Sequence, residues 1–150
     1  MQILGENLKD ETCLEIGKFA ILWNCFESKY CQNNANPTTI KESCDRITID
    51  HAKLNQFAKT LKNRINFLGE SIDAYVENGL HPEGSRRSTP TDMSLMKVFL
   101  EQHDGSLEQG CLLIIYRIRN NLMHGLKCIE ELEIQFELFS NANLILEAIC

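Results

Sequence analysis

Six consecutive residues near position 120 combine the side chains that handle a phosphate group, namely a guanidinium, amides and an imidazole. The segment reads Arg119-Asn120-Asn121-Leu122-Met123-His124. An arginine can hold a phosphate through two parallel hydrogen bonds, and a histidine exchanges protons near neutral pH. Asn120 and His124 are four residues apart, so on a helix the amide can orient the imidazole. This spacing predicts acid–base chemistry at a phosphate site.

The residues before the segment predict the helix that carries it. Apolar side chains recur every three or four positions over residues 107–124, and Gly125 follows as a helix-ending glycine. On a helical projection Arg119 falls inside the apolar arc. The opposite side holds Asn120, His124, Arg117 and Asn121. An arginine in an apolar arc is costly to bury without a partner. Arg119 is therefore expected either to form an internal ion pair, to extend its charged end to solvent from the edge of the arc, or to bind a phosphate.

The segment resembles the Arg-x4–6-His signature of the HEPN superfamily, a group of all-α domains that includes many RNA-cleaving toxins and phage-defence proteins. Asn120 matches the polar residue that usually follows the arginine, and Gly125 completes the common form Arg-Asn-Asn-x-x-His-Gly. The resemblance covers the sequence of residues 112–126 only. It implies metal-independent cleavage of RNA, in which a 2′-hydroxyl attacks the adjacent phosphate and leaves a 2′,3′-cyclic phosphate and a 5′-hydroxyl end.

The resemblance also implies roles for individual residues. His124 is the expected general acid or base, Arg119 stabilises charge on the phosphate, and Asn120 positions one of the two. The expected substrate-binding residues are Arg117, Asn121, Arg86 and Arg87. Arg117 lies seven residues before His124 and also fits the loose signature, so it is the second candidate for the main phosphate contact.

The loop at residues 79–90 has two interpretations. It carries the adjacent Arg86 and Arg87, together with prolines and glycines. It is therefore either a solvated connector or a loop that contacts phosphate.

The spacing of the motif predicts a site made by two chains. Arg119 and His124 are five residues apart, or about 140° around a regular helix, so they diverge unless the last turn distorts. HEPN domains typically dimerise, which would bring two motifs together. We therefore expect a homodimer whose interface includes residues 115–126. Some HEPN toxins have a modified tyrosine two residues after the histidine, where this chain has Leu126.

Helical periodicity over most of the chain predicts a single all-α domain spanning residues 1–150, an up-down bundle of HEPN-like type. Four long helices and one short helix are expected. Their approximate ranges are 6–30, 54–78, 107–124 and 128–149 for the long helices and 91–103 for the short one. Thr48 or Asp50 is the candidate cap of the second helix. Residues 31–47 are rich in turn-forming residues and predict a loop.

Composition limits the function classes. The chain has 150 residues, of which 43% are hydrophobic and 24% charged, and its net charge is −6. Residues 128–150 carry five acidic and no basic side chains, whereas residues 81–127 carry six basic and five acidic ones. A surface that coats nucleic acid needs local positive charge, so the acidity excludes a broad interface but allows a small site in the middle of the chain.

The remaining signals concern partners and location. The seven cysteines are scattered without a Cys-x-x-Cys pair, which predicts free thiols in a reducing cytoplasm and neither a metal nor another cofactor. No apolar run approaches the roughly 18 residues of a membrane span, and the N-terminus lacks a signal peptide. The expected partners are RNA, such as tRNA or another single strand, and an antitoxin or regulatory protein.

Two other interpretations stay open. The chain is either a noncatalytic HEPN-like module that binds RNA or a protein, or a helical bundle in which the motif is accidental. The acidic side chains after residue 128 would repel RNA but could meet a basic partner, which favours the first of these.

Overall fold

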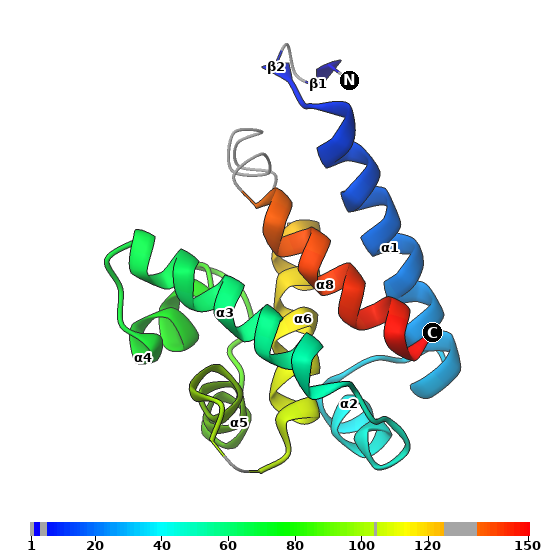
Figure 1. Ribbon diagram of the computed structural model, residues 1–150, viewed down its shortest axis with the longest axis vertical. Coiled ribbons are helices and arrows are strands. Elements are labelled where there is room, and N and C mark those ends of the chain that lie inside the picture. The colour runs from blue at the N-terminus through cyan, green and yellow to red at the C-terminus, as the bar shows by residue number, and fades with distance from the viewer. Residues whose placement is uncertain (1, 4–5, 104, 125–134) are drawn as a thin grey trace.

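The computed structural model describes residues 2–3, 6–103, 105–124 and 135–150, with side chains described in 8–103, 105–122 and 135–150. Over these ranges the chain is built almost entirely of helices, which confirms the all-α class (Figure 1). A short antiparallel pair, β1 (Gln2–Ile3) with β2 (Glu6–Asn7), was not expected. Gly125 and the predicted start of the last helix lie outside the described residues.

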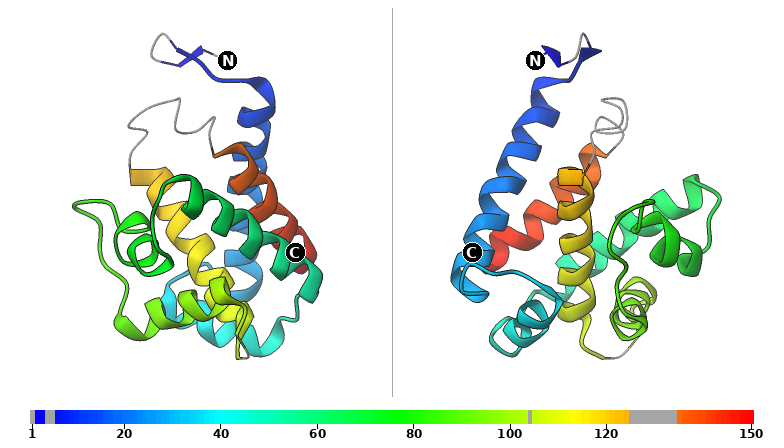
Figure 2. Two further views of the ribbon diagram at one scale, coloured as in Figure 1. Left: turned by 60° about the vertical axis from the view of Figure 1, so that its left-hand side comes forward. Right: turned by 180° about the vertical axis from the view of Figure 1, so that it is seen from behind.

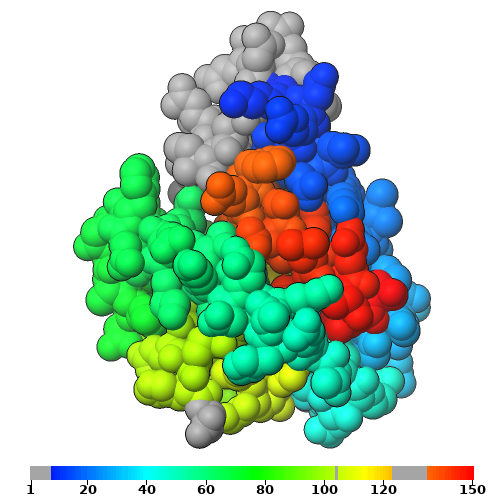
Figure 3. All heavy atoms as spheres, viewed as in Figure 1, coloured from blue at the N-terminus to red at the C-terminus, as the bar shows by residue number. Residues whose placement is uncertain are grey.

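Three long helices form one layer of the fold. They are α1 (Asp10–Tyr30), α3 (His51–Phe67) and α8 (Phe136–Ile149). α8 packs against both of the others and lies between them on the face shown in Figure 3. The buried aromatic side chains of α1, Phe19, Trp23 and Phe26, recur at steps of four and three, as a helix with one core-facing side requires.

α6 (Leu107–His124) runs through the centre of the molecule behind this layer (Figure 2). It packs against α2, α3 and α5, and the ring of its Tyr116 meets that of Trp23 in α1 at 6.1 Å between centroids. Its bounds are those that the apolar periodicity predicts. A helix in this position is covered on several sides, which decides where its polar residues lie.

α5 (Pro90–Glu101) packs tightly on α6. A Cβ atom added at Gly110 of α6 would lie 2.2 Å from the carbonyl oxygen of Leu95 in α5, so glycine permits this close approach. The Thr89 hydroxyl caps α5 by accepting a hydrogen bond from the Asp92 amide. The first turn of α5 is thereby fixed beside α6.

Two predicted boundaries were wrong in the first third of the chain. The first helix begins at Asp10 and not near residue 6. The expected loop at residues 31–47 contains α2 (Pro37–Ser43) and the 3-10 turn η1 (Cys44–Arg46). Asn36 and Thr39 cap α2 by exchanging side-chain and backbone hydrogen bonds, and proline is favourable at the first helical position.

The predicted second helix is interrupted. α3 is capped by Asp50, as one of the two candidates proposed, but it ends at Phe67. Gly69 has a φ of +70°, a left-handed conformation that ends the helix, and the Ser71 side chain caps a new start. α4 (Ile72–Ala74) and the π-helical turn η2 (Tyr75–Gly79) follow.

Two further observations concern the described residues. No disulfide joins any two of their cysteines. None of their helices combines the length and the apolar character needed to cross a membrane.

Candidate functional site

A cleft of about 700 Å³ lies beside the second half of α6. Its walls come from the start of α2, the loop after η2, the first turn of α5, and α6 itself. Four of the predicted site residues line it: Arg86, Arg87, Arg117 and Asn120. Residues from distant parts of the sequence therefore meet at one place.

Arg117 is the most buried charged residue of this group, with 5% exposure. Its Nε donates to the carbonyl oxygen of Leu80 at 3.2 Å, Nη1 to the carbonyl oxygen of Arg86 at 3.0 Å, and Nη2 to the Ser85 hydroxyl at 3.3 Å. Arg117 thus binds the loop from the α6 side and fixes its backbone. The helical projection placed this residue on the polar side of α6, but that side is covered by the loop.

The positive charge of Arg117 is not neutralised by a carboxylate within the part of the chain that the structure describes. All three of its acceptors are uncharged. Burial lowers the pKa of the guanidinium from its ordinary value, because desolvation disfavours the charged form. A buried cation without a counter-ion favours an anion in the cleft.

His81 anchors the other end of the same loop. Its Nδ1 lies 2.8 Å from the carbonyl oxygen of Val76, and the Ser88 amide donates to its Nε2 at 3.1 Å. Since a carbonyl only accepts and an amide only donates, the ring is neutral with its proton on Nδ1. Burial, and then the charge of Arg117, lower the pKa of His81. Hydrogen bonds of His81 and Arg117 therefore hold the loop near both of its ends.

Asn121 supports the loop and does not line the cleft. Its Nδ2 donates to the carbonyl oxygen of Leu80 at 3.2 Å, the same atom that Arg117 binds. Its buried Oδ1 has no partner among the described residues. The expected substrate-binding role of Asn121 thus has a structural alternative.

Arg119 is half-buried and lies outside the cleft lining. Its Nη1 donates to Asn120 Oδ1 at 3.3 Å. This contact occupies the oxygen of the Asn120 amide and leaves the NH2 group to donate to a ligand in the cleft. Arg119 and Asn120 are therefore in contact, and Asn120 is the one of the two that lines the cleft.

The described structure gives the backbone position of His124 but not its side chain. The backbone remains α-helical from Leu107 to His124, so Arg119 and His124 stay about 140° apart in helical register. Within the predicted dimer interface, Ile115, Arg117 and Ile118 are buried in the single chain.

Arg86 and Arg87 are exposed on the loop that Arg117 fixes. Arg87 Nη2 donates to the carbonyl oxygen of Glu77 at 2.8 Å, which ties it to η2. Neither arginine forms an ion pair with a described carboxylate, so both charges are available to an anion in the cleft.

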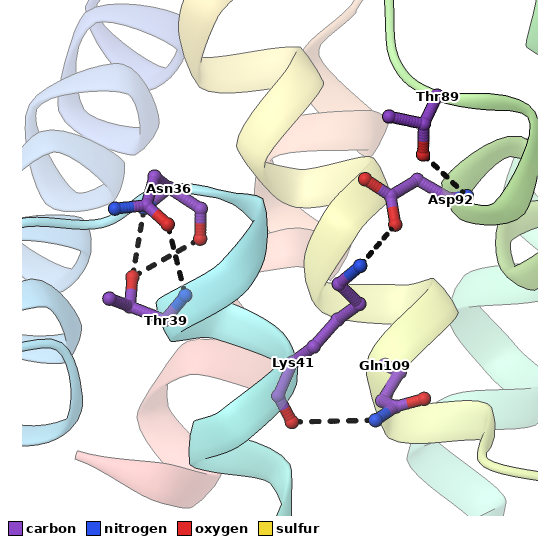
Figure 4. A network of polar contacts seen from close by, with 6 residues as sticks. All are labelled: Asn36, Thr39, Lys41, Thr89, Asp92 and Gln109. Carbon is purple, nitrogen blue, oxygen red and sulfur yellow. Dashed lines mark hydrogen bonds and ion pairs between the residues drawn. The ribbon is translucent and has the colours of Figure 1, made fainter.

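The opposite wall of the cleft consists of residues that were not predicted as site residues from the sequence. Lys41 of α2 reaches across α6 to Asp92 of α5, with 2.7 Å between Nζ and Oδ1 (Figure 4). Asn36 and Thr39 also line the cleft. The signal was the sequence Asn36-Pro37-Thr38-Thr39, which can cap and begin a helix as well as form a turn.

The charge of the cleft is opposite to that of the chain. Its lining has four basic side chains, Lys41, Arg86, Arg87 and Arg117, and the single carboxylate of Asp92. The chain as a whole has a net charge of −6. Among the described residues no group of three or more His, Cys, Asp or Glu side chains is arranged to hold a metal ion. The cleft is suited to binding a phosphate-bearing ligand through cations, hydroxyls and amides.

Comparison with protein-family models, with curated proteins and with solved structures gave no match for this chain. The geometry of the cleft and the motif in α6 are thus the two features that bear on function.

Proposed function

We propose that this protein is a metal-independent endoribonuclease of HEPN type, a toxin or phage-defence enzyme that cuts RNA at a site shared by two copies of the chain. The observation that carries the proposal is the cationic cleft beside Asn120, in the helix that bears the Arg119-to-His124 motif. A site of this charge in an acidic protein supports a ligand with several phosphates.

In the proposed reaction the 2′-hydroxyl of one nucleotide attacks the adjacent phosphorus. Its proton passes to a base, the bond from phosphorus to the 5′-oxygen breaks, and that oxygen receives a proton from an acid. His124 provides one of these proton transfers and the partner's His124 the other. Arg119 stabilises the charge that develops on the phosphate, and Asn120 holds Arg119 through its amide oxygen.

The helical register supports two copies. Arg119 and His124 diverge on a backbone that is α-helical to residue 124. A twofold axis near the end of α6 would place His124 of one copy opposite Arg119 of the other. The expected result in sedimentation at micromolar concentration is a dimer, and a monomer would contradict the shared site.

A noncatalytic HEPN-like module that binds RNA or a protein partner is the second candidate. The observation that favours it is the position of Arg119, which contacts Asn120 and does not line the cleft. Under this alternative the cleft binds an anion and no bond is broken.

The experiment that separates the two candidates is cleavage of total tRNA and of a labelled single-stranded RNA in EDTA. We expect products with cyclic-phosphate and 5′-hydroxyl ends. His124→Ala should reduce the rate by about 100-fold or more, because it removes a general acid–base group. Activity only after addition of a divalent metal would exclude the proposed chemistry, and no cleavage by a folded dimer would favour the binding module.

His103→Ala is the matched control. His103 follows α5, its side chain is 69% exposed, and it lies outside the cleft lining. We expect its cleavage rate to equal that of the unmodified protein. Arg119→Ala and Arg117→Ala, compared at equal fraction folded, would rank the two arginines as phosphate contacts.

A further inference from the structure

The ion pair between Lys41 and Asp92 joins two walls of the cleft. Lys41 extends from α2 across the face of α6, and Asp92 lies in the first turn of α5 (Figure 4). The Asp92 side chain is 2% exposed and that of Lys41 is 31% exposed. The acidic partner is therefore fixed in the interior while the basic partner remains accessible from the cleft.

The backbone at both ends of this pair is held independently of the pair. The Asp92 amide donates to the Thr89 hydroxyl at 3.1 Å, and Gln109 of α6 donates to the carbonyl oxygen of Lys41 at 3.4 Å. Lysine has a flexible stem and three rotatable donors. Its ammonium group can thus turn to another anion without movement of α2 or α5.

Lys41 differs from the other cations of the cleft. Of the four basic residues in the cleft lining, it is the one that is paired with a described carboxylate, whereas Arg86, Arg87 and Arg117 meet uncharged acceptors or none. Asp92 lies in the first turn of α5, where the helix dipole favours an anion. The positive charge of Lys41 is therefore paired with Asp92 until another anion enters the cleft.

The remaining lining indicates which part of a nucleic acid the cleft can recognise. It consists largely of hydroxyl and amide groups, and its aromatic member, Tyr116, packs its ring against Trp23. Recognition of bases in single strands commonly uses open aromatic faces, whereas phosphates and sugars are bound by cations and hydroxyls. A cleft of about 700 Å³ is in the size range of pockets for small ligands and accommodates a short stretch of one strand, not a duplex.

We propose that the cleft binds the sugar–phosphate backbone of a single strand at more than one phosphate, and that Asp92 is an internal competitor for Lys41. The arginines of the loop between η2 and α5, residues 80–89 and hereafter the 80–89 loop, hold one phosphate of the strand. A neighbouring phosphate takes Lys41 from Asp92, so that the strand bridges α2 and the loop. The inference rests on the proposed function, because the strand it names is the one that the enzyme would cut. It adds phosphate contacts on α2 that the motif does not contain.

The test measures binding without cleavage. The probe is a fluorescein-labelled single-stranded deoxyoligonucleotide of about 12 residues, which lacks the attacking 2′-hydroxyl, and its anisotropy is followed over roughly 0.05–0.3 M salt. Asp92→Asn should tighten binding about fivefold at 0.1 M salt, because Lys41 no longer has to leave a carboxylate to bind phosphate. The salt dependence should steepen by about 0.7 in log–log slope, because the charge of Lys41 is no longer offset by Asp92 and counts as one more net cation at the single strand.

The double variant Lys41→Met/Asp92→Asn isolates Lys41 without leaving a buried carboxylate unpaired. It should lose the whole gain of Asp92→Asn and return the slope to a value at or below that of the unmodified protein. Lys59→Met is the matched control, because Lys59 is exposed on α3 away from the cleft, and it should change binding less than twofold. Circular dichroism of each variant identifies any that fails to fold, and Asp92→Ser then replaces Asp92→Asn.

Four results would overturn the inference, and three of them concern the affinity for the oligonucleotide. They are no binding of the oligonucleotide, equal affinity of Asp92→Asn and the unmodified protein, and equal affinity of Asp92→Asn and the double variant. Inorganic phosphate in competition distinguishes a strand from a free anion: displacement at matched phosphate concentration would also overturn it. Failure of the proposed function is separate, since a protein that binds as described but leaves RNA intact retains this inference and loses only the cleavage.

Discussion

The two halves of α6 differ in what surrounds their side chains. In the first half, the five residues Cys111–Ile115 are each at most 1% exposed, whichever direction they face. In the second half, buried Ile118 alternates with polar side chains that contact the 80–89 loop and the cleft. One helix thus begins as a central core element and ends as the support of a polar site.

The difference indicates how a small helical domain can carry a charged site. The first half fixes the axis of α6 through close packing, which uses apolar contacts and tolerates almost no change in volume. The second half then needs only local hydrogen bonds to hold the loop and its arginines. The two halves should consequently respond differently to substitution: the first should lose global stability, and the second should lose the order of the loop.

The largest expected effect is in the first half, at Gly110. Gly110→Ala places a methyl group 2.2 Å from the carbonyl oxygen of Leu95 and 2.7 Å from Cβ of Phe99, so α5 must move away from α6. We expect the free energy of unfolding in urea to fall by about 3 kcal/mol.

Gly17→Ala provides the control, because a Cβ at this exposed position of α1 meets no atom within 4 Å. It should raise stability by about 0.5–1 kcal/mol through helix propensity. If Gly110→Ala and the unmodified protein had equal free energies of unfolding, the close contact between α5 and α6 would not be present, and the first half of α6 would not differ from the second in this way.

The next effect is in the second half, at Arg117. Arg117→Met keeps the length of the side chain but leaves the carbonyl oxygen of Arg86 without its donor, and the carbonyl oxygen of Leu80 keeps only its bond from the Asn121 amide. We expect a loss of about 2 kcal/mol, smaller than for Gly110 because removal of a buried charge offsets part of it. Limited trypsin digestion should cut after Arg86 or Arg87 faster than in the unmodified protein, since the loop becomes mobile.

Arg46→Met is the comparison for this substitution, because exposed Arg46 donates to the carbonyl oxygen of Tyr30, far from the loop. Its digestion pattern at the loop should match that of the unmodified protein. If Arg117→Met unfolds the whole chain with no prior cutting in the loop, the two halves of α6 are one cooperative unit and the contrast between them is wrong.

The same contrast explains which features the sequence predicted. The bounds of α6 were predicted correctly, and Asp50 was one of the two candidate caps of α3. Both features depend on local signals, namely apolar periodicity and a side chain that accepts from a nearby amide. Which of Arg117 and Arg119 is the more buried was not predicted correctly. A projection that assumes one buried side fails for a central helix, where the polar side is covered by another segment and Arg117 becomes the more buried residue.

The cleft was only partly predictable. Arg86, Arg87, Arg117 and Asn120 were named from their types, and they do meet at the cleft. The partners of Arg117 are backbone carbonyls 31 and 37 residues away, and every residue carries a carbonyl, so no sequence pattern reveals them. The pair between Lys41 and Asp92 spans 51 residues and depends on a helix, α2, that the turn-rich composition concealed.

The smallest expected effect concerns His81, which fixes the loop on the other side from Arg117. Its pKa is lowered in the folded chain by burial and by the charges of Arg117 and Arg87, although the carbonyl oxygen of Val76 opposes this shift. The unfolded chain therefore binds a proton more readily, with an ordinary pKa of about 6.5. The stabilising contribution is complete above about pH 6.5 and is lost as the pH falls through the folded pKa.

We expect the free energy of unfolding to decrease between about pH 7.5 and 5.5 in the unmodified protein, and this decrease to be smaller in His81→Gln, which cannot take up the proton. His103→Gln, at an exposed position, should keep the pH dependence of the unmodified protein. Parallel curves for the unmodified protein and His81→Gln would show that another group titrates, and the loop would then be held from the α6 side alone.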